Sequence, residues 1–228
     1  MRSATGLGPA PFITAREGED AAPADDLVIL NPERWPTIHY WDEDPRDRPL
    51  QRAGLSVLWA RCWLNPLDDR GMPMGAPVWK DMHPYRQMGT MLGLRCQVCA
   101  GPAKTPLGYV FLAGPKDQDP AQPTFDTNQP PVCPKHARSA AALCPHMEKN
   151  PMVFLVQAGD APLYGVHGTV YGLNASSEVV VVATPDHALP FGHPNIATTV
   201  ASQLIRRLTS FRVLGIDELT QELTALAT

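Results

Sequence analysis

The sequence lacks several features that would assign it to a common functional class. No apolar run approaches the roughly 18 residues that a membrane span needs, and the N-terminus has neither the basic nor the apolar region of a signal peptide. Neither GxxxxGKS/T nor GxGxxG occurs, so a nucleotide-binding enzyme finds no support. We therefore expect a soluble, cytoplasmic protein with no membrane partner.

Charged residues are also few, at 18%, and the net charge is −4. This balance argues against a generally basic nucleic-acid-binding protein. The charge is unevenly spread, because residues 1–50 hold ten acidic and five basic side chains, whereas residues 80–149 hold five acidic and eight basic ones. A local anion-binding face in the middle of the chain therefore stays open as an interpretation.

Proline is abundant, with 25 residues, but prolines and 17 glycines together reach only about 18% of the chain. That share is below the roughly 25–30% typical of low-complexity chains. We expect a folded protein with many rigid, irregular connections, because each proline fixes φ and removes a backbone donor. In a reducing compartment, the five cysteines are more typical of metal ligands or reactive thiols than of disulfides.

The patterning predicts an α+β fold, in which a treble-clef-like zinc module packs on a small antiparallel sheet beside a long C-terminal amphipathic helix. We divide the chain into four segments. These are a flexible leader (1–25), a proline-rich segment with one strand and a short helix (26–92), a zinc-binding module (93–150), and a β-meander with C-terminal helices (151–228). Within the leader, the apolar stretch 11–15 can dock on the body as an extended segment.

Periodicity supplies the individual elements. Alternation over 55–64 predicts a strand, and Pro84 at a first helical position predicts a helix to Leu92. Further strands are predicted at 108–113, 152–157, 164–171 and 178–183, and a last short helix at 217–226. The long helix is predicted to begin at His193-Pro194, from apolar residues at three- to four-residue spacing: Ile196, Val200, Leu204, Leu208 and Phe211.

Two ligand pairs predict a zinc site at Cys96, Cys99, Cys133 and His136. The first pair is followed by Ala-Gly-Pro, a small-residue turn that allows both sulfur atoms to point at one ion. Pro134 after Cys133 indicates a helix start, which places His136 one turn later on the same side. Four sulfur or nitrogen donors match a structural zinc ion, so we expect Zn²⁺ as the cofactor.

Cys144-Pro145-His146 follows this motif and allows three interpretations. Cys144 can be a buried cysteine at a helix end, with His146 capping the last carbonyl groups. Either residue can instead replace His136 as a ligand. Cys144 can also be a reactive thiol that is paired with a nearby histidine.

Several motifs spread over most of the chain resemble a family of actinobacterial proteins that has no established activity. The shared stretches are PFITA at 11–15, HPYRQ at 83–87, CQVCAGPA at 96–103, PPVC at 130–133, LCPH at 143–146 and YGVHG at 164–168. Members of that family tend to carry cysteine where this chain has His136. Because cysteine and histidine exchange readily as zinc ligands, the resemblance implies that His136 is the fourth donor.

Three functions are compatible with these features. The first is a zinc-stabilised binding or accessory protein that contacts protein or nucleic acid through the zinc module, with Arg206 and Arg207 as further phosphate contacts. The second is an enzyme, for which the candidate catalytic residues are Cys144, His146, His167 and His193. The third, a treble-clef nuclease, is disfavoured because no histidine lies between Cys99 and Cys133.

Overall fold

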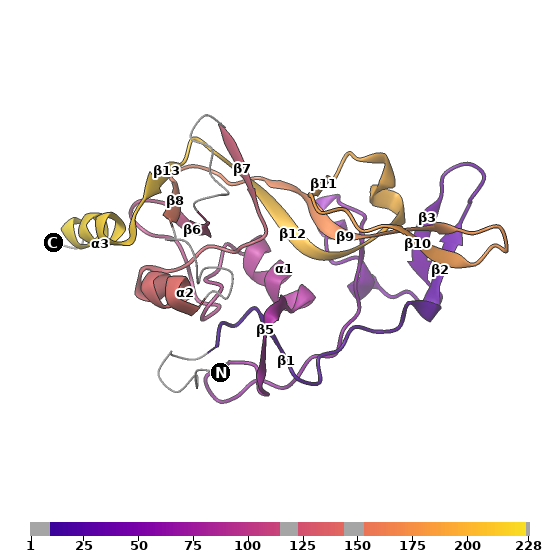
Figure 1. Cartoon of the computed structure of the whole chain (residues 1–228), viewed down its shortest axis with the longest axis horizontal. Coiled ribbons are helices and arrows are strands. Elements are labelled where there is room, and N and C mark those ends of the chain that lie inside the picture. The colour runs from indigo at the N-terminus through magenta and orange to yellow at the C-terminus, as the bar shows by residue number, and fades with distance from the viewer. Residues whose placement is uncertain (1–9, 115–122, 144–152, 227–228) are drawn as a thin grey trace.

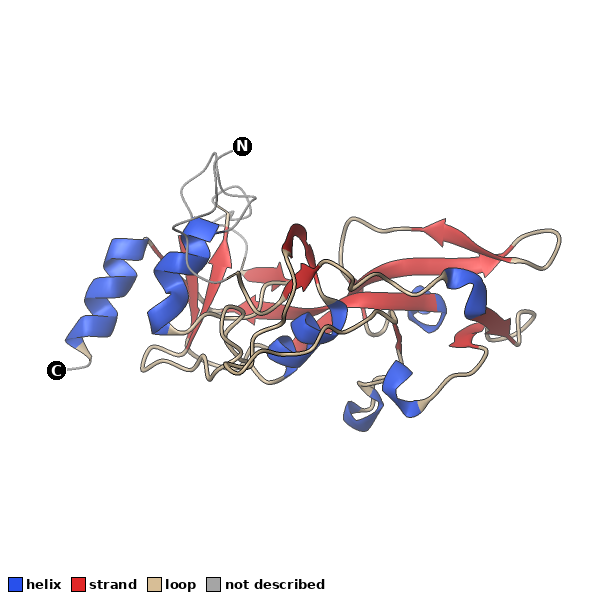
Figure 2. Cartoon of the chain, turned by 90° about the horizontal axis from the view of Figure 1, so that it is seen from below, coloured by secondary structure: helices blue, strands red, loops and turns tan. Residues whose placement is uncertain are grey.

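The computed structural model describes residues 10–114, 123–143 and 153–226. The fold is mixed α+β, as the sequence predicted, but it consists mostly of sheet and has few helices. The described α-helices are α1 (Pro84–Leu92), α2 (Ala137–Leu143) and α3 (Ile216–Ala225). The chain is elongated, with α2 and α3 at one end and β2, β3 and β10 at the other (Figures 1 and 2).

The largest sheet is built around the long strand β12, and its order is β10-β9-β12-β4, with β11 paired to β9 and β7 paired to β12. β12 pairs antiparallel with β9 and β7 and parallel with β4. The bounds of these strands are β4 (Leu58–Trp59), β7 (Thr124–Thr127), β9 (Leu163–Leu173), β10 (Val179–Ala183), β11 (Leu189–Pro190) and β12 (Thr199–Thr209).

Three smaller sheets surround this one, with β1 paired to β5, β2 paired to β3, and β8 lying between β6 and β13. Their strands are β1 (Thr14–Arg16), β2 (Leu27–Leu30), β3 (Thr37–Tyr40), β5 (Pro77–Met82), β6 (Tyr109–Ala113), β8 (Val153–Gln157) and β13 (Arg212–Leu214). Short 3-10 helices are η1 (Ala24–Asp26), η2 (Pro45–Asp47), η3 (Gln51–Ala53), η4 (Pro134–His136) and η6 (Pro194–Thr198).

The predicted long C-terminal helix is wrong, because η6 and then β12 occupy its place. Val200, Leu204 and Leu208 are each buried, but they do not share one side, because register shifts interrupt β12 between Ala201 and Gln203 and between Ile205 and Arg206. A spacing of four residues brings side chains to one face of a helix, but it is also twice the two-residue period of a strand. β12 carries these side chains into three different hydrophobic clusters. The last short helix is confirmed as α3.

The predicted meander holds only in part. β9 and β10 form an antiparallel pair, as predicted, but β8 lies in another sheet between β6 and β13. Both faces of β8 are covered, because Phe154 and Val156 face one hydrophobic cluster and Leu155 faces another. A strand buried on both faces needs covering layers on two sides, which a meander with one exposed face does not provide.

The part of the predicted leader that the structure describes, from residue 10 onward, packs on the rest of the chain. The stretch 11–15 docks on the body, as expected, but it is not extended throughout: Phe12 and Ile13 form a turn, closed by the bond from the N–H of Thr14 to the carbonyl oxygen of Pro11, and only then does β1 begin. Ile13 is buried, and so is the carboxylate of Glu19, which forms an ion pair with Arg86 of α1. Acidic side chains are mostly exposed, so an acidic segment is expected to lie in solvent. A carboxylate that pairs with a buried arginine is an exception, because the ion pair allows it to be buried.

Residues 26–92 contain the predicted helix, α1, which begins after His83 with Pro84 in its first turn. The strand predicted over 55–64 is confined to β4, and β2, β3 and β5 were not predicted. Prolines limit each of these strands to a few residues, too short for a clear alternation to appear in the sequence.

α1 is attached to β12 by polar side chains. Gln87 bonds to both backbone groups of Leu204, because its Nε2 donates to the carbonyl oxygen at 2.9 Å and its Oε1 accepts from the N–H at 2.8 Å. Arg206 donates to the carbonyl groups of Met91 and Leu92, at the end of the helix. Arg206 is therefore buried and satisfied, which corrects its prediction as a phosphate contact. These bonds fix the helix that leads directly into Cys96.

Candidate metal centre

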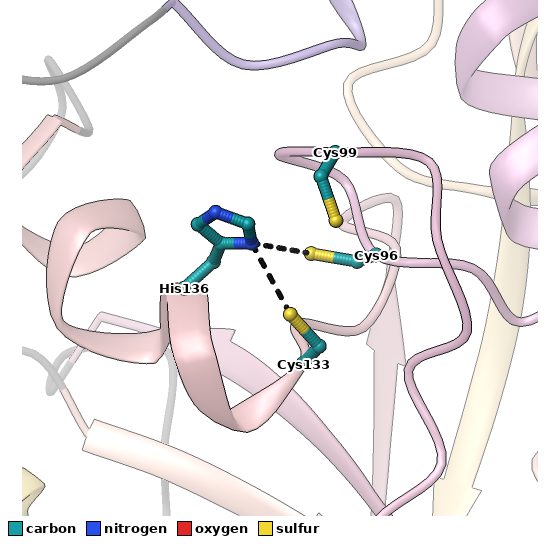
Figure 3. Close-up of side chains that lie close together, drawn as sticks. All are labelled: Cys96, Cys99, Cys133 and His136. Carbon is teal, nitrogen blue, oxygen red and sulfur yellow. Dashed lines mark hydrogen bonds between the residues drawn. The ribbon is translucent and has the colours of Figure 1, made fainter. Parts of the chain in front are cut away.

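Cys96, Cys99, Cys133 and His136 meet in space, as the sequence predicted. One ligand atom from each lies within 4.8 Å of the ligand atoms of the other three. Nδ1 of His136 lies 3.2 Å from Sγ of Cys133 and 3.9 Å from Sγ of Cys96. Figure 3 shows the imidazole ring turned toward these sulfur atoms, with Cys96 and Cys99 presented from one turn.

The turn that carries Cys96 and Cys99 is closed by its own backbone. The N–H of Cys96 donates to the carbonyl oxygen of Gly101, and the N–H of Ala100 donates to that of Cys96, both at 2.8 Å. A β-carbon at Gly101 would lie 3.4 Å from Sγ of Cys99, so this position packs directly against the sulfur. Ala100 has φ +55°, in the left-handed region that favours glycine.

This backbone conformation gives a first prediction. Ala100→Gly is expected to stabilise the protein by about 0.5–1 kcal/mol, because glycine adopts a positive φ without the steric cost of a β-carbon. Urea unfolding of the metal-loaded protein measures the effect. Ala53→Gly is the matched control, because Ala53 lies in the short helix η3 and no positive φ is found there. A destabilisation by Ala100→Gly equal to that of the control would contradict the prediction.

The second ligand pair lies at a helix start, as predicted. Cys133 is the N-cap of η4, Pro134 occupies its first turn, and α2 continues the chain from Ala137. The N–H of His136 donates to the carbonyl oxygen of Cys133 at 2.9 Å, which places the two side chains one turn apart. A cap followed by proline therefore sets the geometry of this pair locally.

The protonation of these groups is coupled to metal binding. Burial raises the pKa values of the Cys96 and Cys99 thiols, while nearby backbone N–H groups act in the opposite direction. Burial also lowers the pKa of His136, so its imidazole is neutral at pH 7 and offers a lone pair. A divalent cation compensates for the burial of thiolates by displacing their protons.

The donor set fits a tetrahedral metal ion. Metal–sulfur distances near 2.3 Å and metal–nitrogen distances near 2.0–2.1 Å give a sulfur–nitrogen separation of about 3.6 Å across a tetrahedral site. The observed separations of 3.2 and 3.9 Å lie on either side of that value. Three sulfur atoms and one imidazole nitrogen, all within 4.8 Å of one another, could therefore hold a metal ion.

The centre is part of a hydrophobic core rather than an appendage. Cys96 is fully buried and packs in one cluster with Phe154 of β8 and Leu219 of α3. The side chain of Gln97 donates to the carbonyl oxygen of Pro130, which ties the first ligand turn to the segment that carries the second pair. The metal centre and the C-terminal elements thus share one core.

Within the described residues, the chain between the ligand pairs does not form the two-stranded hairpin of a treble clef, although the N–H of Val132, just before Cys133, donates to the carbonyl oxygen of Val110 in β6. β6 pairs with β8, and β7 pairs with β12, so neither strand pairs with the other. Both faces of β6 are buried, because Val110 faces one hydrophobic cluster and Phe111 faces another. The treble-clef arrangement is therefore not confirmed.

Only two of the four candidate catalytic residues, His167 and His193, lie in the described part of the chain. Cys144 and His146 lie outside the described residues. His193 caps η6, because its Nδ1 accepts from the N–H of Asn195 at 3.1 Å. His167 lies in β9, where burial and then the nearby His187 lower its pKa. Within the described part of the chain, no hydrogen bond or ion pair joins His167 or His193 to the four-residue cluster.

The structure brings together one pair that sequence reasoning missed, Cys62 and His83. Sγ of Cys62 lies 3.5 Å from Nε2 of His83, which itself donates to the carbonyl oxygen of Trp63 at 2.9 Å. Burial raises the pKa of Cys62 to about 11, and burial also lowers the pKa of His83. Both groups are thus neutral at pH 7, so the pair does not supply a thiolate nucleophile.

Comparisons with known proteins give no assignment, because no protein-family model, curated protein or solved structure matches this chain. Among the helices of the described residues, none has the length and apolar content required to cross a membrane. Fold and site together define the class: a mixed α+β protein with a Cys₃His cluster that can hold a metal ion.

Proposed function

We propose that the protein is a zinc-stabilised binding protein, in which Zn²⁺ held by Cys96, Cys99, Cys133 and His136 has a structural role. The observation that carries this proposal is the complete set of four donors. Structural zinc sites use four sulfur or nitrogen ligands, whereas catalytic zinc sites keep one position for water or substrate. Soft thiolate ligands and a tetrahedral arrangement favour zinc over magnesium, calcium or manganese.

A protein partner is better supported than a nucleic acid. Several arginines form ion pairs, including Arg138, which follows His136 by two residues, with Asp217, and Arg212 with Glu222. Arg207 pairs with Asp126 and lies over the ring of Tyr164, and Arg206 is buried. These cations are therefore partly neutralised before any phosphate could approach. Tryptophan side chains, in contrast, are exposed by 71–82%: Trp35, Trp41 and Trp63. Exposed tryptophan is enriched at protein interfaces.

The metal is tested by analysis of the purified protein. We expect about one zinc ion per chain, and we expect a chelator at neutral pH to abolish cooperative unfolding of the zinc-containing core. Addition of ZnCl₂ should restore it, whereas MgCl₂ should not. Protein that contains no bound metal and has an unchanged melting temperature after chelation would contradict the proposal.

Chromatography on heparin distinguishes a protein partner from a nucleic-acid partner. The zinc-loaded protein should pass through heparin at low ionic strength, because salt-sensitive retention is the property of proteins that bind phosphate backbones. Retention that falls steeply with added salt would favour nucleic acid as the partner. The exposed tryptophans would then need another explanation.

A further inference from the structure

A cavity of about 850 Å³ lies apart from the four metal ligands, and none of them lines it. Its walls are partly apolar, with Pro23, Trp63, Leu64 and Tyr85 among the lining residues. This volume is within the roughly 300–1,000 Å³ of typical ligand-binding pockets. The cavity is therefore large enough to accept two or three side chains from another molecule.

The lining of this cavity is acidic. The lining has a formal charge of −2, because it contains four carboxylates and two guanidinium groups. The carboxylates belong to Asp26, Asp42, Asp44 and Asp47, and the guanidinium groups belong to Arg46 and Arg61. Arg61 is shared by Asp42 and Asp47, at 2.7 and 2.6 Å. Arg46 pairs with Asp44 at 2.6 Å. The two arginines are thus committed to carboxylates, and the surplus negative charge favours a cationic ligand.

Large apolar side chains border the same cavity without a partner to cover them. Trp63 is 71% exposed and Leu64 is 60% exposed. The backbone of Trp63 is nevertheless fixed, since its N–H donates to the carbonyl oxygen of Asp20 and its carbonyl oxygen accepts from the buried His83. An exposed side chain on a fixed backbone is prepared for contact, which lowers the entropy cost of binding.

We propose that this cavity binds a segment of a partner protein in which an arginine or lysine stands next to an apolar side chain. The cation lies among the carboxylates, and the apolar side chain packs against Trp63 and Leu64. A small organic cation satisfies the charge but leaves both exposed side chains without a contact, so a peptide segment fits the surface better. The inference rests on the proposed function, because it names the partner chemistry of the binding protein.

Fluorescence anisotropy with a designed peptide tests the inference on the full, zinc-loaded chain. The probe is a fluorescein-labelled hexapeptide that alternates arginine and leucine, and the comparison peptide carries glutamate in place of arginine. We expect the arginine peptide to bind and the glutamate peptide to bind at least about tenfold more weakly, because like charges oppose contact. Trp63→Ala should weaken binding by about tenfold, the effect of losing an aromatic anchor.

Matched variants separate a specific site from general attraction. Trp35→Ala removes a tryptophan that is 80% exposed and does not line the cavity, so its affinity should stay within about twofold of the parent. Asp26→Asn should weaken binding by about threefold, as expected for one exposed charge, whereas Asp186→Asn outside the lining should not. Zinc content is measured for every variant.

Four outcomes would overturn the inference. These are no binding of the arginine peptide, equal binding of the glutamate peptide, equal losses from Trp63→Ala and Trp35→Ala, and binding of benzamidinium alone as tight as that of the peptide. The last outcome would make the cavity a small-cation site. If the protein retains zinc and gives any of these results, only this inference is contradicted. If the protein contains no zinc, the proposed function itself is contradicted.

Discussion

Cys96→Ser is expected to leave the protein without zinc and with the surrounding core unfolded. Structural zinc contributes about 10 kcal/mol or more in small zinc domains, and serine is a poor substitute for a thiolate donor. Cys96 is fully buried and packs with Phe154, Leu214 and Leu219, so loss of the ion also disturbs the elements that follow it in the chain. Metal analysis and thermal unfolding by circular dichroism measure both effects.

Cys62→Ser is the matched control for this experiment. Cys62 is a free, partly buried cysteine that lies outside the cluster of four ligands. The control should bind zinc in the parent's ratio, and its melting temperature should fall far less. Should Cys96→Ser retain zinc and melt like the control, the four-ligand site and the structural role proposed for it would both be wrong.

The second large effect is expected from Glu19→Ala, which removes a buried carboxylate from its arginine. Glu19 binds Arg86 through both oxygen atoms, at 2.6 and 2.5 Å, and neither side chain is more than 4% exposed. The loss of one partner leaves an unpaired buried cation, which costs about 3–5 kcal/mol. Urea unfolding of the zinc-loaded protein measures the change, which should exceed that of Glu222→Ala, whose partner Arg212 is exposed.

The same ion pair gives a pH dependence with a definite sign. Burial alone raises the pKa of Glu19, but hydrogen bonds from Arg86, Asn65 and Arg16 outweigh burial. The pKa of Glu19 is therefore lowered from its ordinary value of 4.5 to about 2. The folded state therefore binds the proton more weakly than the unfolded state, so this stabilisation is present above pH 4.5 and is lost as the pH falls toward 2.

A comparison of two proteins isolates this contribution. The difference in unfolding free energy between the parent and Glu19→Ala should be constant near neutral pH and shrink below pH 4.5. The comparison is confined to pH values at which both proteins retain zinc, because loss of the ion would itself abolish cooperative unfolding. A difference that grows on acidification would show that Glu19 is protonated, and not paired as an anion, in the folded protein.

The metal cluster was predictable because its determinants are local. A two-residue gap between Cys96 and Cys99 and a proline after Cys133 each set the geometry of one pair within a few residues. The meeting of the two pairs followed from the coordination chemistry of a single ion. The Cys62–His83 pair was not predictable in this way, because 21 residues separate its members and no motif joins them.

The strand order was much less predictable. Val200, Leu204 and Leu208 satisfy the helical and the extended period together, and only the partners β4, β7 and β9 select the strand. Likewise, the burial of Glu19 depends on Arg86, which lies 67 residues further along the chain. Tertiary contacts of this kind override the local preference, and a single sequence does not reveal them.

The central position of β12 has a consequence for biosynthesis. Leu58 and Trp59 of β4 pair with Val200 and Ala201 of β12. β4 is synthesised early in translation, and it cannot pair until β12 has been synthesised much later. Until then β4, β7 and β9 expose unpaired backbone groups and apolar side chains. Such topologies have a high contact order, fold slowly and are prone to aggregate while the chain is incomplete. A nascent chain that ends before residue 199 therefore has the side strands of this sheet but lacks the strand that joins them.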